Sequence, residues 1–495
     1  MISALWRFSV LLLVLAISHG SALAEDKPAD KKQASGEKKA GDKPDSDKKA
    51  KGDKDDDELE IPPPPKGWDF KRPLSDADYK RKKRGSYVTG LPLANFDPDT
   101  GVGGGVRGYY FFNGDRKHPL FGYTPYLHRL FAQYFRTTKG LQFHWADYDA
   151  PAIAGTPYRL RAQAIYMRNT QQNFFGIGNA AMDELSFTGS GQTFSEFSKY
   201  RRTIETVRGD GTALTRYDQY DFVRPILLMS LEQTFLRGLI RPLVGLGFTH
   251  TDITDYTGTM VDAETVGGSE VRAPMGTTRL LEHCNAGLLV GCEGGWDNFL
   301  RFGVAFDTRD FEPDPNRGLF ADIGVDIGTK GLGGGYTYIR FLAAVRGYFS
   351  PMPKKADLVL AGRATFVAQS ENTPFFSMNT LPYTDEPRTG LGGLRTLRGF
   401  KQDRFFGRTM ALLNLETRWT FHRFELFNQK FALIGVVFLD TGRVFDKAAD
   451  LTLSKWRTGV GSAFRIAWNQ ATIVTADYGV SREDTGLYIN FNHMF

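Results

Sequence analysis

The two cysteines of this sequence, Cys284 and Cys292, lie close together in the segment HCNAGLLVGC. Two cysteines in 495 residues exclude a disulfide-dense scaffold. In an exported chain, a pair this close favours a local loop disulfide. His283 lies next to Cys284, but two thiols and one imidazole at this spacing fit no standard zinc pattern. We therefore expect a disulfide between Cys284 and Cys292, and no metal site.

Catalytic motifs are not found elsewhere in the sequence. Gly103, Gly105 and Gly108 have the spacing of a dinucleotide-binding loop, but they lie in a strand-like pattern with no helix behind it. The nucleophile elbow Gly-x-Ser-x-Gly does not occur, and the eight histidines are scattered. We expect neither an enzyme nor a cofactor. A hydrolase assembled from residues distant in sequence stays open, because a sequence does not reveal a triad formed in space.

The N-terminus predicts export. Residues 1–24 contain the basic Arg7, an apolar run over residues 8–17 and the sequence Ala-Leu-Ala at 22–24. These are the parts of a secretory signal peptide, with cleavage expected after Ala24. The apolar run is about half the roughly 20 residues of a spanning helix, so an N-terminal anchor is disfavoured. No later apolar run reaches that length, so a chain that spans a membrane must do so with strands.

A charged tail follows the signal peptide. Residues 25–60 contain ten Lys, thirteen Asp or Glu and no aromatic residue, so they bury too little apolar surface to offset their ordering entropy. The prolines at 62–65 favour a short polyproline stretch. We expect a disordered periplasmic tether over residues 25–66, a linker over 67–84 and a folded domain over 85–495. The net charge of +6 is spread along the chain, so we expect no nucleic-acid binding.

From residue 85 onward, apolar and polar residues alternate as in β-strands. In residues 411–421 one face carries Leu413, Leu415, Trp419 and Phe421, and the other carries Asn414, Glu416, Arg418 and Thr420. The pattern recurs in residues 298–309, 460–468 and 474–478. A soluble sandwich turns the apolar face inward, whereas a membrane barrel turns it toward lipid. Alternation alone does not separate the two.

Strand length favours the membrane barrel. Segments of about ten residues match the length that crosses a bilayer at a tilt. Turn clusters divide the region into sixteen strands, with long excursions near residues 170–214, 253–297 and 370–407. The chain ends with Phe491 and Phe495, and a terminal aromatic residue on the last strand is typical of outer-membrane barrels. We predict an all-β, sixteen-stranded antiparallel barrel that crosses the bacterial outer membrane many times, with the N-terminal tail in the periplasm.

The segment GLGGLRTLRGF at residues 390–400 is followed by LNLETRW and then by VVFLDTGRV. Together these segments resemble the bacterial surface antigen superfamily of outer-membrane barrels, which includes the barrel-assembly factor and the transporters of two-partner secretion. The family hallmark is Arg-Gly-Phe or Arg-Gly-Tyr in the sixth extracellular loop, here Arg398, Gly399 and Phe400. The strand count places this tripeptide between strands eleven and twelve. The resemblance is strongest over residues ~295–495.

The resemblance implies a loop that folds back into the lumen, where Arg398 meets Glu416 and Asp440 on strands twelve and thirteen. A guanidinium with five donors is suited to brace a loop against carboxylates. The resemblance also implies insertion or translocation of protein, or of lipid, through a weakened seam between the first and last strands. The alternative is a passive pore or a structural outer-membrane protein.

One departure from the family pattern concerns the region before the barrel. Most relatives carry polypeptide-transport-associated domains there, whereas here only residues 25–84 separate the signal peptide from the barrel. We therefore expect a short, barrel-only member. Its expected partners are the outer-membrane bilayer, the general barrel-assembly machinery for its own insertion, and a client polypeptide.

Overall fold

The computed structural model describes most of the chain from residue 82 onward. The described residues are 82–310, 314–353, 356–378, 380–381, 390–426, 429–468 and 472–495, with Ile61, Pro63, Pro64, Leu74 and Tyr79. The predicted signal peptide and nearly all of the predicted tether lie outside them. In the described part of the chain, no helix is long and apolar enough to cross a bilayer.

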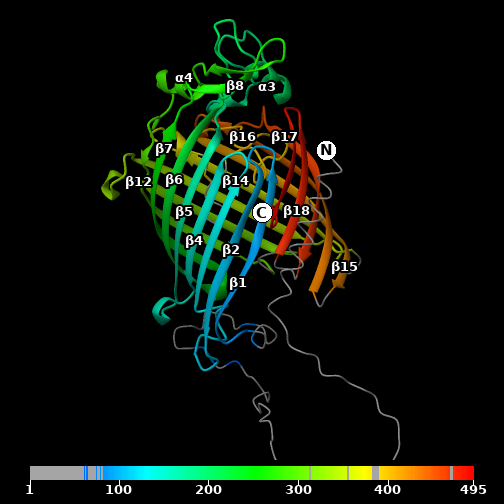
Figure 1. The fold of residues 1–495 in the computed structure, drawn as a ribbon. Helices are drawn as coiled ribbons and strands as arrows, with labels where there is room; N and C mark the ends of the chain where they lie inside the picture. Colours follow the sequence, from blue (N-terminus) through cyan, green and yellow to red (C-terminus); the bar gives the residue numbers. More distant parts are fainter. Residues whose placement is uncertain are drawn as a thin grey trace, which may run out of the picture.

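Sixteen antiparallel strands form a closed barrel, as the sequence predicted (Figure 1). The strands of the wall are β1 (Gly85–Asp97), β2 (Gly101–Gly114), β3 (His128–Thr137), β4 (Leu141–Ala150), β5 (Tyr158–Asn173), β6 (Gln219–Gln233), β7 (Ile240–Thr254), β11 (Phe299–Asp307), β12 (Gly318–Gly328), β13 (Tyr338–Phe349), β14 (Leu358–Gln369), β15 (Thr409–Leu426), β16 (Gln429–Phe445), β17 (Arg457–Trp468), β18 (Thr472–Ser481) and β19 (Thr485–Phe491). The two-residue strand β10 (Gly295–Trp296) pairs with the end of β7.

Long connections cover one end of the barrel. They run over residues 174–218, 255–298 and 370–408, close to the three excursions predicted from the sequence. The first two form a cap with α3 (Phe197–Glu205), α4 (Arg279–Asn285) and the hairpin of β8 (Met260–Glu264) and β9 (Glu270–Pro274) (Figure 1). The remaining helical turns are η1 (Ile153–Gly155), η2 (Gly178–Met182), η3 (Leu236–Gly238), η4 (Lys330–Leu332), η5 (Phe375–Ser377) and η6 (Ala448–Asp450).

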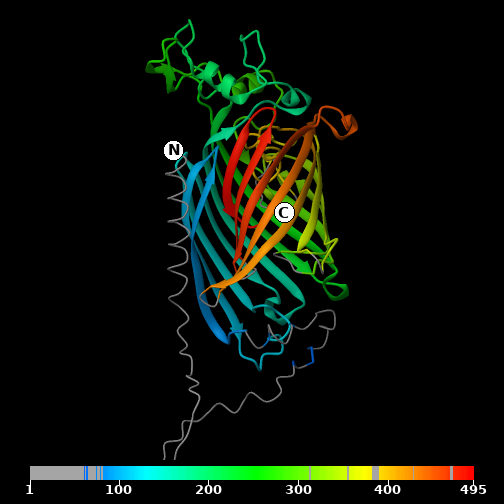
Figure 2. The same cartoon turned by 90° about the vertical axis from the view of Figure 1, so that its right-hand side faces the viewer.

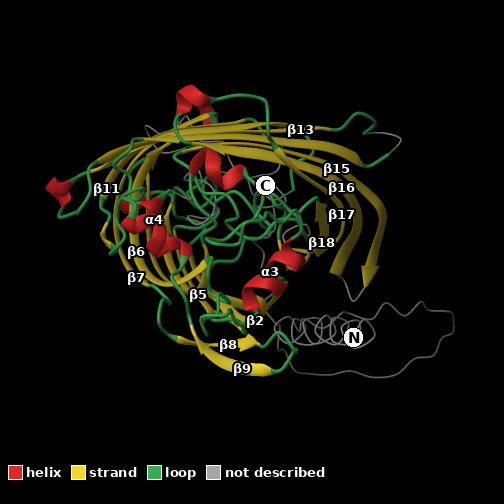
Figure 3. Cartoon of the chain, turned by 90° about the horizontal axis from the view of Figure 1, so that it is seen from above, coloured by secondary structure: helices red, strands yellow, loops and turns green. Residues whose placement is uncertain are grey.

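The apolar face of the strands points outward. On β15, Leu415, Trp419 and Phe421 are about half exposed, whereas the alternating Glu416 and Arg418 are buried. Charged side chains are also buried on other strands, and five arginines are among the largest fully buried side chains: Arg340, Arg363, Arg398, Arg404 and Arg465. An apolar cluster on the buried face of β16 and β17 interrupts this pattern. An apolar outside around a charged inside is the arrangement of a barrel in lipid. Seen from above, the strands form a ring, and α3 and α4 of the cap overlie it in projection (Figure 3).

The barrel closes through a sparse seam between β1 and β19. In the described part of the chain, one position pairs across it, Phe96 with Ile489, whereas β1 pairs with β2 from Gly85 to Asp97. Figure 2 shows the first strands, in blue, continuing below the end of the last strands, in red. Residues 85–94 of β1 therefore present an edge. Pro92 fits this position, because a proline has no N–H to donate and is confined to edge strands.

The C-terminal tail leaves the wall before the chain ends. The last strand stops at Phe491, and Asn492 has a φ of 68°, a conformation that asparagine tolerates better than most residues. His493 and Met494 are buried. The sequence analysis placed Phe495 on the last strand, but β19 stops at Phe491 and the ring of Phe495 lies over Arg363 and Arg418, on the buried face of β14 and β15.

Candidate functional site

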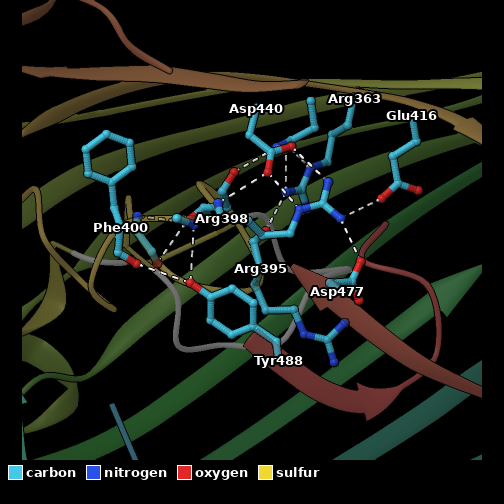
Figure 4. A network of polar contacts seen from close by, with 12 residues as sticks. Arg363, Arg395, Arg398, Phe400, Glu416, Asp440, Asp477 and Tyr488 are labelled. Carbon is cyan, nitrogen blue, oxygen red and sulfur yellow. Dashed lines mark hydrogen bonds and ion pairs between the residues drawn. The ribbon is translucent and has the colours of Figure 1, made fainter. Parts of the chain in front are cut away.

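Arg398 is the centre of a buried polar network (Figure 4). It lies in the connection between β14 and β15, the eleventh and twelfth wall strands, where the sequence predicted it. Its Nε and Nη2 donate to the two carboxylate oxygens of Asp440 on β16, at 2.8 and 3.0 Å. Its Nη1 donates to Glu416 on β15 at 2.9 Å and to Asp477 on β18 at 3.0 Å. One guanidinium thereby joins three strands.

The arginine is taken fully out of water. Arg398 and Asp440 are both 0% exposed, and Glu416 and Asp477 are nearly so. Ionised groups are tolerated at such positions when each one is paired and hydrogen-bonded. The bidentate contact with Asp440 meets this need and also fixes the orientation of the guanidinium. The network is therefore a rigid tie between the loop and the wall.

Glu416 links Arg398 to two further arginines. Its carboxylate accepts from Arg465 Nη2 at 2.8 Å and from Arg418 Nε at 2.8 Å, in addition to Arg398. Arg465 lies on β17 and is 0% exposed. The sequence placed Glu416 and Arg418 on the charged face but did not assign Arg465 or Asp477 to the Arg398 site. Alternation had put both on the polar face of their strands, which is the signal by which they could have been found.

Gly399 and Phe400 fix the backbone beside Arg398. Gly399 has a φ of 92°, and a Cβ there would meet the backbone of Val480 at 2.8 Å. A side chain at this position would be strained and would also collide with β18, so glycine is required. Phe400 is buried and packs edge-on against Phe405, with ring centroids 5.4 Å apart. It belongs to a buried apolar cluster that includes Leu391 and Leu397 of the same connection.

Lys401, the next residue, bridges the two sides of the seam. Its Nζ lies 3.1 Å from Asp99, in the turn after β1, and 3.1 Å from Asp484, in the turn before β19. Burial by itself lowers the pKa of Lys401, but the two carboxylates outweigh it and raise that pKa above its ordinary value. No local sequence pattern indicates this contact, because Asp99, Lys401 and Asp484 are far apart along the chain.

The two cysteines lie in the cap. Cys284, in α4, is joined to Cys292 by a disulfide with a Cα–Cα distance of 6.0 Å. The cap has its own buried ion pair, in which Arg279 Nε lies 2.6 Å from Asp218 and the hydroxyl of Tyr200 donates to Asp218 at 2.5 Å. Burial, and then the charge of Asp218, raise the pKa of Tyr200 well above its ordinary value.

Solved structures with a similar arrangement are distant in sequence. BamA from Haemophilus ducreyi lacking POTRA domains 1–3 is 13% identical, with 83% of this chain and 70% of that chain covered and a TM-score of 0.47. CdiB from Escherichia coli is 12% identical, with 82% of this chain and 62% of that chain covered and a TM-score of 0.43. CdiB from Acinetobacter baumannii is 13% identical, with 82% of this chain and 60% of that chain covered and a TM-score of 0.40. This chain thus spans less than two thirds of either CdiB chain. No curated protein sequence matches it.

Two family models match the chain. A domain of unknown function (DUF5982) matches residues 66–127, the region from before β1 to the start of β3. The Omp85 superfamily domain matches residues 241–492, which include Arg398 and all three of its carboxylate partners. The second match spans just over half of the chain. The protein is therefore an outer-membrane β-barrel that belongs to the Omp85 superfamily.

Proposed function

We propose that this barrel inserts polypeptide into the outer membrane, or translocates it across, by opening the seam between β1 and β19. The sparse pairing of that seam carries the proposal. In this proposal the connection over residues 370–408 is the sixth extracellular loop, folded into the lumen, and the tail before β1 lies in the periplasm. Residues 85–94 of β1 are the edge that an incoming strand meets first.

The physical reason is the cost of bare backbone in lipid. An unsatisfied N–H or C=O in hydrocarbon costs several kcal/mol, so an open strand edge in the bilayer favours any strand that can pair with it. A strand that adds to an exposed edge supplies those hydrogen bonds from its main chain. Such pairing therefore depends little on the side chains of the incoming strand. Val88 is exposed and lies on the part of β1 without a partner across the seam in the described residues, so its side chain points outward beside the backbone edge that such an incoming strand would meet.

The Arg398 network supports one half of the barrel while the seam moves. Its carboxylate partners lie on β15, β16 and β18, so it stiffens the C-terminal part of the wall. Lys401 extends from the same loop to Asp99 and Asp484 and holds the seam at the capped end. Release of Lys401 would free β1 without disturbing the Arg398 contacts.

A reversible disulfide across the seam, called the lock below, tests the proposal. Cysteines replacing Phe96 and Ile489 are at paired positions, within the Cα separation that a disulfide spans. In cells that depend on this protein, we expect the oxidised lock to lower the amounts of the client proteins in the outer membrane and a reductant to restore them. The matched control places cysteines at Leu415 and Leu439, a paired position of β15 and β16, and should have no effect.

The opposite outcome favours the passive pore. If the locked protein supports normal amounts of outer-membrane proteins, and the purified barrel conducts ions steadily with or without the lock, the seam has no part in function. The proposal would then be withdrawn.

A further inference from the structure

The outward face of β3, β4 and β5 carries a row of three alanines. Ala132 pairs with Ala146, and Ala146 pairs with Ala164, so the three lie side by side on neighbouring strands. All three are exposed. Neighbouring strands lie about 4.8 Å apart, so the row is about 10 Å long. Figure 1 shows β4 and β5 next to one another below the cap.

Large side chains border the alanine row on both sides. Tyr134, His144 and Tyr166 each lie two residues from an alanine, on the side of the capped end, where the β3–β4 turn contacts the β1–β2 turn. Their rings are stacked, with centroids 4.5 Å apart from Tyr134 to His144 and 5.8 Å apart from His144 to Tyr166. On the other side of the row, Leu130 pairs with Tyr148. The alanines therefore form the floor of a trough.

The trough continues onto β6 and β7 as an apolar groove of about 550 Å³. Its lining includes Pro225 and Leu227 of β6, Phe248 of β7 and Trp296 of β10. Leu227 is 41% exposed and Trp296 is 50% exposed, so the groove opens outward. The outward face of a membrane barrel is covered by lipid. In the membrane, a groove of this shape and polarity is therefore suited to an acyl chain.

A row of polar side chains follows the rings toward the capped end. Arg136 pairs with Gln142, and Gln142 pairs with Arg168. The charge of Arg168 is matched by Asp221 on β6, with Nη2 2.8 Å from a carboxylate oxygen. Arg136 is exposed and has no ion-pair partner among the residues that the structure describes. An unmatched cation thus lies on the outward face, beyond the stacked rings.

We propose that this groove binds a membrane lipid with an anionic headgroup, which places one acyl chain over the alanine row and the headgroup at Arg136. The order of the three rows along the strands carries the assignment. Aromatic residues favour the interface between lipid and water, and basic residues near the membrane surface attract anionic lipids. Cation, rings and trough thus follow one another as headgroup, interface and acyl chain do in a lipid.

The groove lies in the half of the wall that the Arg398 network does not reach. The groove is on β3 to β7, whereas the carboxylate partners of Arg398 are on β15, β16 and β18. A bound lipid contacts several strands at once, as the guanidinium of Arg398 does. The lipid therefore steadies the N-terminal part of the wall from outside.

Competition between two lipids tests the headgroup. The purified protein in detergent is mixed with equal amounts of dioleoylphosphatidylglycerol and dioleoylphosphatidylcholine, which have the same acyl chains, and native mass spectrometry counts the lipids retained. We expect the anionic lipid to be retained about fivefold more, the effect of one arginine near a membrane surface. Arg136→Gln should remove this preference. Arg423→Gln is the matched control, because Arg423 is an exposed arginine of β15 that pairs with Asp357. Equal retention of both lipids by wild type, or a preference unchanged in Arg136→Gln, would overturn the proposal.

A larger side chain in the trough tests the acyl-chain site. Ala146→Leu fills the middle of the alanine row and should lower the retention of both lipids. Ala364→Leu is the matched control, because Ala364 is an exposed alanine of β14, where it pairs with Val345 and Leu413. Unchanged retention in Ala146→Leu would contradict the proposal. So would a dimer in the spectrum that Ala146→Leu abolishes, since the groove would then bind a second copy of this chain.

A photoreactive lipid locates the site. Phosphatidylglycerol with a diazirine in one acyl chain is irradiated with the protein, and the modified peptides are identified by mass spectrometry. We expect modification of β4, β5 and β6 in wild type and its loss in Ala146→Leu. Modification spread evenly over the wall would show an unselective lipid shell and refute the site. None of these measurements requires transport or an open seam, so this site and the proposed function can fail independently.

Discussion

Replacement of Arg398 by alanine removes the cation that pairs with Asp440. Asp440 accepts from Nε and Nη2 of Arg398, which the alanine variant lacks. It keeps the backbone N–H of residue 398 and, among the described side chains, Asn414 Nδ2 at 2.8 Å. Glu416 keeps Arg418 and Arg465, and Asp477 keeps Arg465 and Thr475. The main consequence of Arg398→Ala is thus a carboxylate left without its cation at a position that is 0% exposed.

The size of this effect follows from the cost of a broken buried pair. Removing one partner of a buried ion pair costs about 3–5 kcal/mol, because the remaining charge is uncompensated. Asp440→Asn removes that charge while keeping the shape. We therefore expect the double variant to lose less free energy of unfolding than the sum of the two single losses, by about 0.5–3 kcal/mol.

Urea unfolding of the barrel in detergent measures these differences. The matched control is Arg423→Ala, whose guanidinium is mostly exposed and whose loss should cost under about 1 kcal/mol. We expect Arg398→Ala to be still exported and folded, but with a clearly lower midpoint. If Arg398→Ala matches Arg423→Ala in stability, or if the effects at 398 and 440 simply add, the bracing role of Arg398 is refuted.

Three further predictions concern the loop, the seam and the cap. Lys401→Met should speed hydrogen exchange in β1 and β19 but not in β15, because it frees Asp99 and Asp484. Exchange rates in β1 and β19 equal to those of wild type would exclude a role of Lys401 in holding the seam. Gly399→Ala should lower the urea midpoint, since a Cβ there meets the Val480 backbone at 2.8 Å, and an unchanged midpoint would contradict the close approach. Reduction of the Cys284–Cys292 disulfide should make the cap protease-sensitive while the barrel stays folded, as trypsin digestion would reveal; loss of the barrel itself would show that the two are coupled.

The wall of the barrel was predictable because its signals are local. Alternation in residues 411–421 placed Glu416 on the polar face and Leu415 on the apolar face, and the structure buries the first and exposes the second. Turn clusters gave the strand number and the place of Arg398 between strands eleven and twelve. What alternation did not give was which face points outward, and that came from burial in the closed barrel.

The remaining features depend on contacts between distant segments. Lys401 meets Asp99 and Asp484 only because the barrel closes, so no window of sequence contains the contact. The C-terminal tail was predicted to continue the last strand, since Phe491 and Phe495 keep the alternation. The turn at Asn492 and the arginines that hold Phe495 come from other parts of the wall, and the local pattern gave no sign of either.

The most direct test of the central claim is a photo-crosslinking residue at Val88, compared with one at Leu415. Both side chains face outward, but Val88 is on the sparsely paired edge of β1, whereas Leu415 is on a strand paired on both sides. We predict that irradiated cells yield crosslinks from position 88 to a polypeptide in transit, and none from position 415. Crosslinks to lipid alone at both positions would contradict the account and leave the protein as a closed barrel with no client at its seam.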